Sequence, residues 1–190
     1  MKTKVLTLAL CALSLNAMAV KKNIKQLEFD ASKGKQMELT MPRGELVRYT
    51  AYEHLYFVTN VEDTTYQYLN IYVPEGATEA TPIFLRTYVG GYMASKAGQP
   101  QASDATGRAL KEGYVVVIPG SRGRNSVITK GKKTIYTGRA PKAILDLKAA
   151  IRYLRHFDKQ IPGNTERIIT DGTSAGGAMS ALMGGTGNNI

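Results

Sequence analysis

Apolar and polar positions alternate residue by residue in the first part of the chain, which is typical of half-buried β-strands. Residues 45–52 alternate loosely and residues 66–73 alternate well, and the second run stops at Pro74-Glu75-Gly76. Both runs are rich in β-branched and aromatic residues, which together with this stop predicts an antiparallel pair of strands. Residues 81–89 predict a third strand, which ends at Gly90-Gly91.

The pattern changes in the middle of the chain. Residues 103–112 predict a short helix closed by Gly113, and residues 114–118 follow as an unbroken apolar run. A strand that is apolar on both faces belongs at the centre of a sheet that is covered on both sides. Residues 119–138 are then predicted to form a long polar loop.

The clearest helix begins at Pro141 and has one apolar stripe on an otherwise basic surface. The stripe has helical spacing and consists of Ile144, Leu147, Ala150, Ile151 and Leu154. Residues 167–170 predict another short strand, and a helix of small residues begins near Ala175. Two leading strands followed by alternating strands and helices predict an α/β domain with a mostly parallel sheet and flanking helices.

The first 19 residues have the features of a secretory signal peptide. Lys2 and Lys4 precede an apolar run over residues 5–15, and small residues follow up to Ala19. The run is too short to span a bilayer, so we expect cleavage near Ala19 and export to the periplasm or the medium. Lipidation of Cys11 is the rival interpretation, but bulky Leu10 stands where a small residue would be expected.

Composition limits what the chain can do. Its 190 residues are 43% apolar and 21% charged, which suits one globular domain. Signal cleavage would remove the only cysteine, and with it any disulfide, thiol nucleophile or cysteine-ligated zinc. The formal net charge is +10, but the basic residues are scattered, which is typical of a solvated face. Export also argues against a nucleic-acid partner.

The strongest chemical motif is Gly172-Thr173-Ser174-Ala175-Gly176, which matches G-x-S-x-G between a predicted strand and a predicted helix. The chain must turn sharply there, and the flanking glycines remove side chains that would clash. Such a nucleophile elbow exposes the Ser174 hydroxyl at the carboxyl end of the sheet. The Ala175 amide would then lie at a helix N-terminus, aimed at a developing oxyanion.

Gly90-Gly91 supplies a second part of the expected site. In the α/β-hydrolase architecture one oxyanion-hole donor comes from the loop after the third strand, and glycines let that backbone approach the substrate. Arg122 and Arg124 follow the central strand, where they either orient a substrate or pin the loop.

The general base is harder to find. The only imidazoles, His54 and His156, precede Ser174, whereas the α/β-hydrolase chain order places the histidine last, so we expect both to be structural or solvated. Residues 175–190 contain no Asp, Glu or His, and Asp171 lies on the strand that presents Ser174. A sheet that ends there would leave an apolar edge exposed, so we expect the sequence to be a truncated fragment.

Several motifs together resemble bacterial tannases, the tannin acyl hydrolases of α/β-hydrolase fold. The resemblance covers about residues 40–187 and is more specific than G-x-S-x-G alone. It rests on Tyr68-Leu-Asn-Ile-Tyr-Val-Pro74, Tyr88-Val-Gly-Gly-Tyr92, Gly113-Tyr-Val-Val-Val117, Ser121-Arg-Gly-Arg124, Asp146-Leu-Lys-Ala-Ala-Ile-Arg-Tyr153 and Arg167-Ile-Ile-Thr-Asp-Gly-Thr-Ser-Ala-Gly-Gly177.

The resemblance implies a serine esterase that cleaves galloyl esters, with Ser174 as nucleophile and the amides of Gly91 and Ala175 as the oxyanion hole. Residues 20–190 would be the N-terminal part of a single α/β-hydrolase domain, truncated after the nucleophile-elbow helix. The expected partner is a small aromatic ester, with no cofactor and no metal. Two alternatives stay open: a feruloyl or other carboxylesterase of the same fold, and a non-catalytic remnant or binding module.

Overall fold

The computed structural model describes residues 20–187 and residue 189. The predicted signal peptide (1–19) and Cys11 lie outside the described residues. Within the described part of the chain, no helix is both long and apolar enough to cross a membrane.

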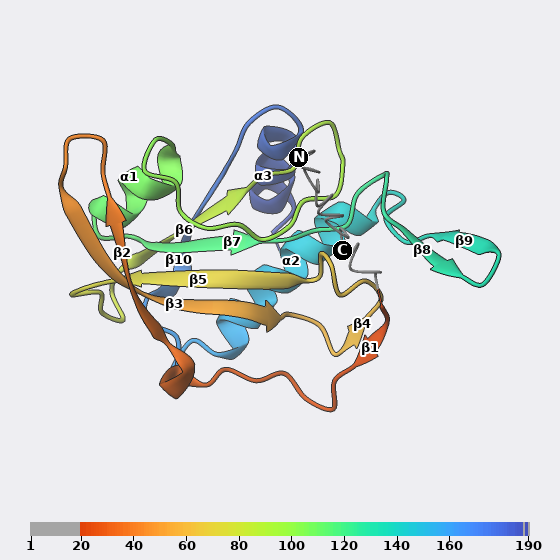
Figure 1. Ribbon diagram of the computed structural model, residues 1–190, viewed down its shortest axis with the longest axis horizontal. Helices are drawn as coiled ribbons and strands as arrows, with labels where there is room; N and C mark the ends of the chain where they lie inside the picture. The colour runs from red at the N-terminus through yellow and green to blue at the C-terminus, as the bar shows by residue number, and fades with distance from the viewer. Residues whose placement is uncertain (1–19, 188, 190) are drawn as a thin grey trace, which may run out of the picture.

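A six-stranded sheet forms the centre of the molecule, with the strand order β10-β6-β7-β5-β3-β2 (Figure 1). The strands are β2 (Lys35–Thr40), β3 (Leu46–Tyr56), β5 (Tyr68–Pro74), β6 (Pro82–Thr87), β7 (Val115–Pro119) and β10 (Asn164–Gly172). The antiparallel pairing of β3 with β5 confirms the predicted N-terminal pair. Within this sheet β10 is an edge strand that pairs only with β6.

The sheet is mixed, which corrects the expectation of a mostly parallel one. β10 pairs in parallel with β6 and β6 with β7, whereas the pairings β7–β5, β5–β3 and β3–β2 are antiparallel. Parallel neighbours need a long crossover connection, usually a helix. Within residues 20–187, helical crossovers follow only β6 and β7, so only this part of the sheet is parallel.

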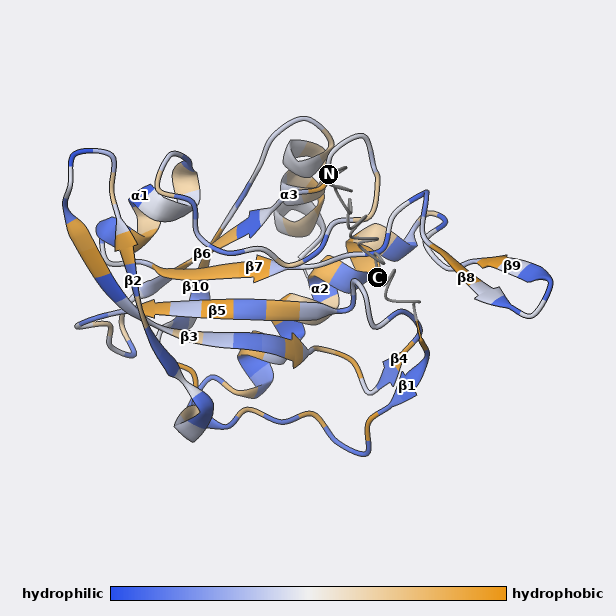
Figure 2. Ribbon diagram, viewed as in Figure 1, coloured by the Kyte–Doolittle hydropathy of each residue, from blue (hydrophilic) through white to orange (hydrophobic). Residues whose placement is uncertain are grey.

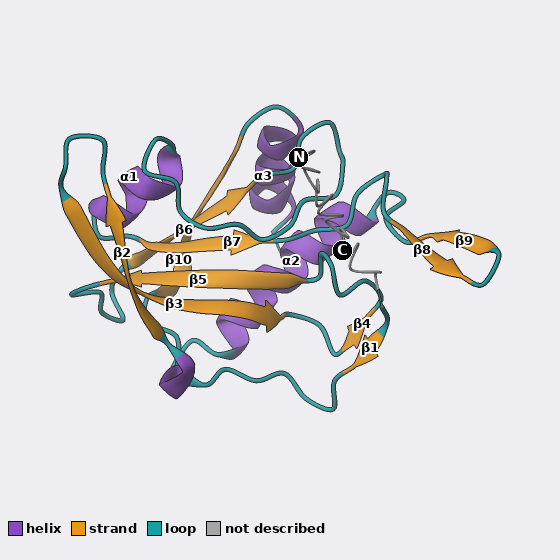
Figure 3. Cartoon of the chain, viewed as in Figure 1, coloured by secondary structure: helices purple, strands orange, loops and turns teal. Residues whose placement is uncertain are grey.

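Helices cover both faces of the sheet, as Figure 3 shows. α1 (Ala105–Lys111) packs on one face through Ala109 and Leu110, against Val116 and Ile118 of β7. α2 (Lys142–His156) and α3 (Ala175–Thr186) belong to the larger hydrophobic cluster on the other face. This arrangement explains why all five residues of β7 are buried. Figure 2 shows β7 as hydrophobic along its length.

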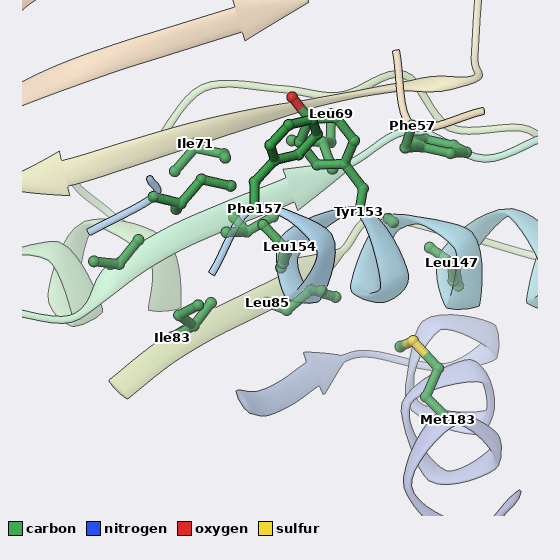
Figure 4. Packing of buried hydrophobic residues seen from close by; sticks show 14 of the residues in the cluster. Phe57, Leu69, Ile71, Ile83, Leu85, Leu147, Tyr153, Leu154, Phe157 and Met183 are labelled. Atoms are coloured by element: carbon green, nitrogen blue, oxygen red, sulfur yellow. The ribbon is translucent and has the colours of Figure 1, made fainter. Parts of the chain in front are cut away.

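The larger core lies between the sheet and α2 (Figure 4). Leu147 and Leu154 of the predicted stripe are completely buried, and Ile151 is half-buried. Their partners on the sheet include Leu69 and Leu85. α2 also buries Asp146, Lys148 and Tyr153, so this helix is not simply apolar on one side and polar on the other.

The segment expected to be a polar loop contains a β-hairpin. β8 (Val127–Lys130) pairs with β9 (Lys133–Tyr136) around a turn at Gly131, whose φ is 61°. Each strand has only four residues, and lysines flank the turn between them. These polar residues favour a loop in the sequence pattern, although the flanking residues are typical of β-strands. The hairpin projects away from the sheet (Figure 1). The sequence pattern also does not indicate the short antiparallel pair of β1 (Lys22–Asn23) with β4 (Asn60–Val61), or the 3-10 turn η1 (Ala31–Lys33).

Candidate active site

Ser174 lies at the turn from β10 into α3, where the chain reverses sharply. Its φ of 55° and ψ of −122° are unusual for a residue with a side chain, and such strain is commonly found at functional sites. The side chain is exposed and makes no capping hydrogen bond to the helix that it begins. The hydroxyl is therefore free to meet a molecule that approaches this edge of the sheet.

Two glycines make the sharp turn possible. A Cβ atom on Gly172 would lie 2.9 Å from the Cα atom of Gly176, closer than real Cβ atoms approach. A Cβ atom on Gly176 would lie 3.0 Å from the carbonyl oxygen of Thr87 and 3.1 Å from that of Val89. The strand end, the helix start and the segment after β6 thus approach one another too closely for side chains at these two positions.

An arginine from the neighbouring strand braces the turn. Arg86 forms an ion pair with Asp171, which is its direct register partner across the β6–β10 pairing. Its Nη2 atom also donates a hydrogen bond to Thr173 Oγ1 at 3.2 Å. The Asp171 carboxylate is thus already engaged by Arg86. The Thr173 hydroxyl is engaged as well, whereas the Ser174 side chain makes no capping hydrogen bond.

The start of α3 offers backbone donors beside Ser174. The first amides of a helix have no intrahelical acceptor and carry the positive end of the helix dipole. Ala175 is the first residue of α3, and its side chain is buried while the preceding hydroxyl is exposed. An anion held next to Ser174 would therefore meet a favourable field.

The segment after β6 forms a tight turn from Gly90 to Met93. The Met93 amide donates to the Gly90 carbonyl oxygen at 2.9 Å, and the two central residues, Gly91 and Tyr92, have φ of 56° and 57°. Positive φ at both central positions is typical of a type I′ turn. Among the described residues no acceptor engages the Gly91 amide. Since Gly176 packs on Val89, this amide lies in the segment adjoining the start of α3.

Tyr88 fixes the end of β6 on the α1 side. Its hydroxyl donates to Asp104 Oδ2 at 2.7 Å, and its ring lies 5.2 Å from the Arg86 guanidinium carbon. Burial, together with this carboxylate, raises the pKa of Tyr88 to about 12. Burial alone would raise the pKa of Asp104, but hydrogen bonds from Thr106 and Tyr88 outweigh burial and lower it. Both groups therefore keep the protonation states that this hydrogen bond requires.

The two arginines after β7 have different surroundings. Arg122 is almost fully buried and makes hydrogen bonds to Asp146 with its backbone N, Nε and Nη2 atoms at 2.9, 2.9 and 2.8 Å. It also pairs with Glu62. Of the two interpretations left open, the structure thus favours pinning of the loop for Arg122. Arg124 is exposed, and its Nε atom donates to the Gly91 carbonyl oxygen at 2.9 Å.

Neither histidine is near Ser174. His156 ends α2, and the chain then runs through the nine residues of β10, about 30 Å, before it reaches Ser174. His54 lies near the same ends of the strands as Ser174, but on β3. This strand is four strand spacings from β10, or about 19 Å. The His54 ring stacks on Tyr68 at 4.2 Å, and its Nε2 atom hydrogen-bonds with the Tyr56 hydroxyl at 2.9 Å.

Burial, and then the charge of Lys22, lowers the pKa of His54. His54 has a φ of 61°, at a bulge in β3, and its amide donates to Asn70 Oδ1 at 2.8 Å. These contacts describe a histidine held in place by its strand, as expected. Among the described residues, no group of three or more His, Cys, Asp and Glu side chains is arranged to hold a metal ion.

Comparison with protein families places this site in a known context. A sequence model of the BD-FAE family matches residues 69–190, which is more than half of the chain and includes the Gly91 turn and Ser174. The chain belongs to the BD-FAE family. BD-FAE is an α/β-hydrolase esterase family, so the mixed sheet with its flanking helices is an α/β-hydrolase-like fold.

Solved structures similar to this BD-FAE chain include tannases. The tannase of Fusobacterium nucleatum is 41% identical with a TM-score of 0.78, and the match covers 86% of this chain and 36% of that one. The tannase of Lactobacillus plantarum is 37% identical with a TM-score of 0.75, covering 84% and 36%. A tannin acyl hydrolase in complex with ethyl gallate is 36% identical with a TM-score of 0.74, covering 84% and 38%. The chain thus spans a little over a third of the length of these tannases, and no curated protein matches it.

Proposed function

We propose that this protein is a serine carboxylic-ester hydrolase of the tannase type, which cleaves galloyl esters through an acyl-enzyme. The observation that carries the proposal is the exposed Ser174, held at φ 55° between β10 and the first turn of α3. In the proposal Ser174 is the nucleophile, and the amides of Gly91 and Ala175 form the oxyanion hole. A turn that strains a serine backbone and leaves its hydroxyl uncapped suits a nucleophile better than a structural serine.

The proposed reaction has two steps. Ser174 Oγ forms a bond to the ester carbonyl carbon while the hydroxyl proton passes to a general base, and the two amides donate to the resulting oxyanion. The tetrahedral intermediate then breaks its bond to the alcohol oxygen, which takes up the proton. Water repeats the sequence on the acyl-enzyme: it gives one proton to the base, releases the carboxylic acid and returns the proton to Ser174.

The general base is proposed to come from another part of the full enzyme. Asp171 is paired with Arg86. His54 and His156 both lie far from Ser174 in the fold. Residues 20–190 are therefore proposed to be the N-terminal part of a single α/β-hydrolase domain. The small share of each tannase that the chain covers supports this division.

The proposed substrate class is the galloyl ester of a tannin. Support comes from solved tannin acyl hydrolases of 36% identity, in complex with ethyl gallate and with 3,4-dihydroxybenzoate. We further propose that the protein acts outside the cytoplasm, after removal of residues 1–19. The support for export is the sequence pattern of those residues.

The first experiment combines two measurements on protein purified from its native host. Intact mass gives the length of the working protein and shows whether residues 1–19 are removed. Hydrolysis of methyl gallate and methyl ferulate by the same sample, with Ser174→Ala as control, gives the activity. We expect a mass above that of this chain and gallate hydrolysis that is lost in the Ser174→Ala variant. Hydrolysis of methyl ferulate alone would favour the alternative of a feruloyl esterase. If neither ester is hydrolysed, the proposed esterase activity is refuted.

A further inference from the structure

The turn from Gly90 to Met93 is held by a loop that is distant in sequence. Arg124 contacts the carbonyl oxygens of both central residues of the turn: its Nε atom donates to Gly91 at 2.9 Å, and its backbone amide donates to Tyr92 at 2.8 Å. The two central residues are also those with positive φ. One residue therefore binds the carbonyl groups of both residues that have positive φ.

Neighbouring residues extend the connection. Asn125 Oδ1 accepts a hydrogen bond from the Ala94 amide at 2.6 Å. Ser95 and Ser121 exchange backbone hydrogen bonds at 2.9 and 2.8 Å, as in an antiparallel bridge. A Cβ atom on Gly123 would collide with the backbone of Met93 and Ala94, so the two loops are also in close contact.

The loop that carries Arg124 is itself rigidly mounted. Arg122 makes three hydrogen bonds to the buried carboxylate of Asp146 on α2. A path of direct contacts thus leads from the core helix through residues 121–125 to the Gly91 turn. Backbone groups with positive φ keep one geometry only when their surroundings determine it.

We propose that Arg124 is a positioning residue for the oxyanion hole, which fixes the Gly90–Met93 turn by hydrogen bonding to the Gly91 carbonyl. This inference deepens the proposed function and rests on it, because it assumes that the Gly91 amide is one of the two oxyanion donors. The carbonyl that Arg124 binds belongs to the same residue as that amide. The two groups lie in adjacent peptide planes that meet at the Gly91 Cα atom. A hydrogen bond that holds the carbonyl therefore restricts the φ and ψ angles of Gly91, which set the direction of the amide relative to it.

The position of the donor matters more than its presence. A donor stabilises the transition state only if it lies within hydrogen-bond distance of the place where the oxyanion forms. A displacement of about 1 Å is enough to reduce a rate about 100-fold. Loss of the Arg124 side chain leaves the Gly91 amide in the protein but releases one of the contacts that orient it.

The test is Arg124→Ala in the enzyme form that hydrolyses methyl gallate. We expect kcat to fall about 10- to 100-fold, with KM close to that of the unchanged enzyme, because the oxyanion is present only after attack. Arg124→Lys keeps the charge but lacks the Nε donor, so we expect most of the loss to remain. Arg139→Ala is the matched control, since Arg139 stacks on Tyr136 of the hairpin and its removal should leave kcat unchanged.

Two outcomes would overturn the inference. A raised KM with unchanged kcat would mean that Arg124 binds the substrate rather than positions the turn. Full activity in Arg124→Lys would mean that only its charge matters.

A second readout separates this inference from the proposed function. Backbone ¹⁵N relaxation and amide exchange of Gly91 and Tyr92 can be measured without turnover in the protein as purified from its native host. We expect both residues to become more mobile in Arg124→Ala and to stay unchanged in Arg139→Ala. If no ester is hydrolysed but this mobility appears, the proposed function fails while the contact between Arg124 and the turn stands. Unchanged mobility refutes the positioning role whatever the activity.

Discussion

Removal of the Asp146 carboxylate should destabilise the fold more than any exposed ion pair does. Asp146 and Arg122 have side chains that are only 2% and 5% exposed, and the carboxylate accepts three hydrogen bonds from Arg122. Gln67 Nε2 adds a fourth at 3.0 Å. Burial alone would lower the pKa of Arg122, but hydrogen bonds and charges from Asp146 and Glu62 outweigh burial and raise it. Because a guanidinium is not deprotonated in proteins, Arg122 stays charged when Asp146 is removed.

The expected cost follows from this geometry. Breaking a buried ion pair by removing one partner typically costs about 3–5 kcal/mol, because the other charge stays buried without compensation. Glu62 still contacts Arg122 in Asp146→Ala, so we expect the lower end, about 3 kcal/mol. In a domain of this size 1 kcal/mol corresponds to roughly 2–4 °C in Tm. Urea unfolding followed by far-UV circular dichroism measures the loss.

The control is an ion pair with the same chemistry in solvent. Arg48 and Glu38 pair at 3.2 Å across β2 and β3, with side chains 63% and 55% exposed. We expect Glu38→Ala to change the free energy of unfolding by less than about 1 kcal/mol. If Asp146→Ala costs no more than Glu38→Ala, the buried pair does not hold the loop after β7 and the reasoning is wrong.

Three further predictions concern single positions. Gly172→Ala should destabilise the fold by several kcal/mol in the same urea assay, because its Cβ atom would collide with the backbone of Gly176. Gly184→Ala should instead stabilise the fold by about 0.5–1 kcal/mol, because a Cβ atom at this position of α3 meets open space. Asp104→Ala removes the side-chain cap of α1 and should cost about 1 kcal/mol, measured as a lower Tm. The pKa of His54 is lower in the folded than in the unfolded protein. Its contribution to stability is therefore present above pH 6.5 and is lost as the pH falls through the folded pKa. In urea unfolding at a series of pH values, this dependence should disappear in His54→Gln.

The sequence predicts those elements whose pattern is local. Residues 114–118 are apolar on both faces, and β7 lies at the sheet centre with both faces covered. The stripe from Ile144 to Leu154 likewise predicts α2 and the side that it buries. In these segments the burial of each residue follows from its position within one strand or helix. The periodicity of apolar residues is therefore sufficient to predict the element and its buried side.

The contacts that depend on pairing across the chain are not predictable in this way. The partner of Arg122 is 24 positions away, and the carbonyl that Arg124 binds is 33 positions away. Nothing in Ser121-Arg-Gly-Arg124 indicates which arginine is buried and which is exposed. A signal did exist in part: Asp146 is an acidic residue on the face of a predicted helix that is otherwise apolar and basic, and such a residue requires a buried partner.

The three loops at the carboxyl edge of the parallel strands share one structural principle. The turn at Ser174 is braced by Arg86 of β6, the Gly91 turn by Arg124 after β7, and the loop after β7 by Asp146 of α2. In each case the bracing group comes from a neighbouring element, so the loop needs no packing of its own around the exposed groups. A site built in this way combines accessible groups with fixed geometry, which is the requirement for a preorganised oxyanion hole. The same logic implies that substitution of a bracing group outside a loop, such as Arg86 or Asp146, should disturb the geometry of the loop that this group holds.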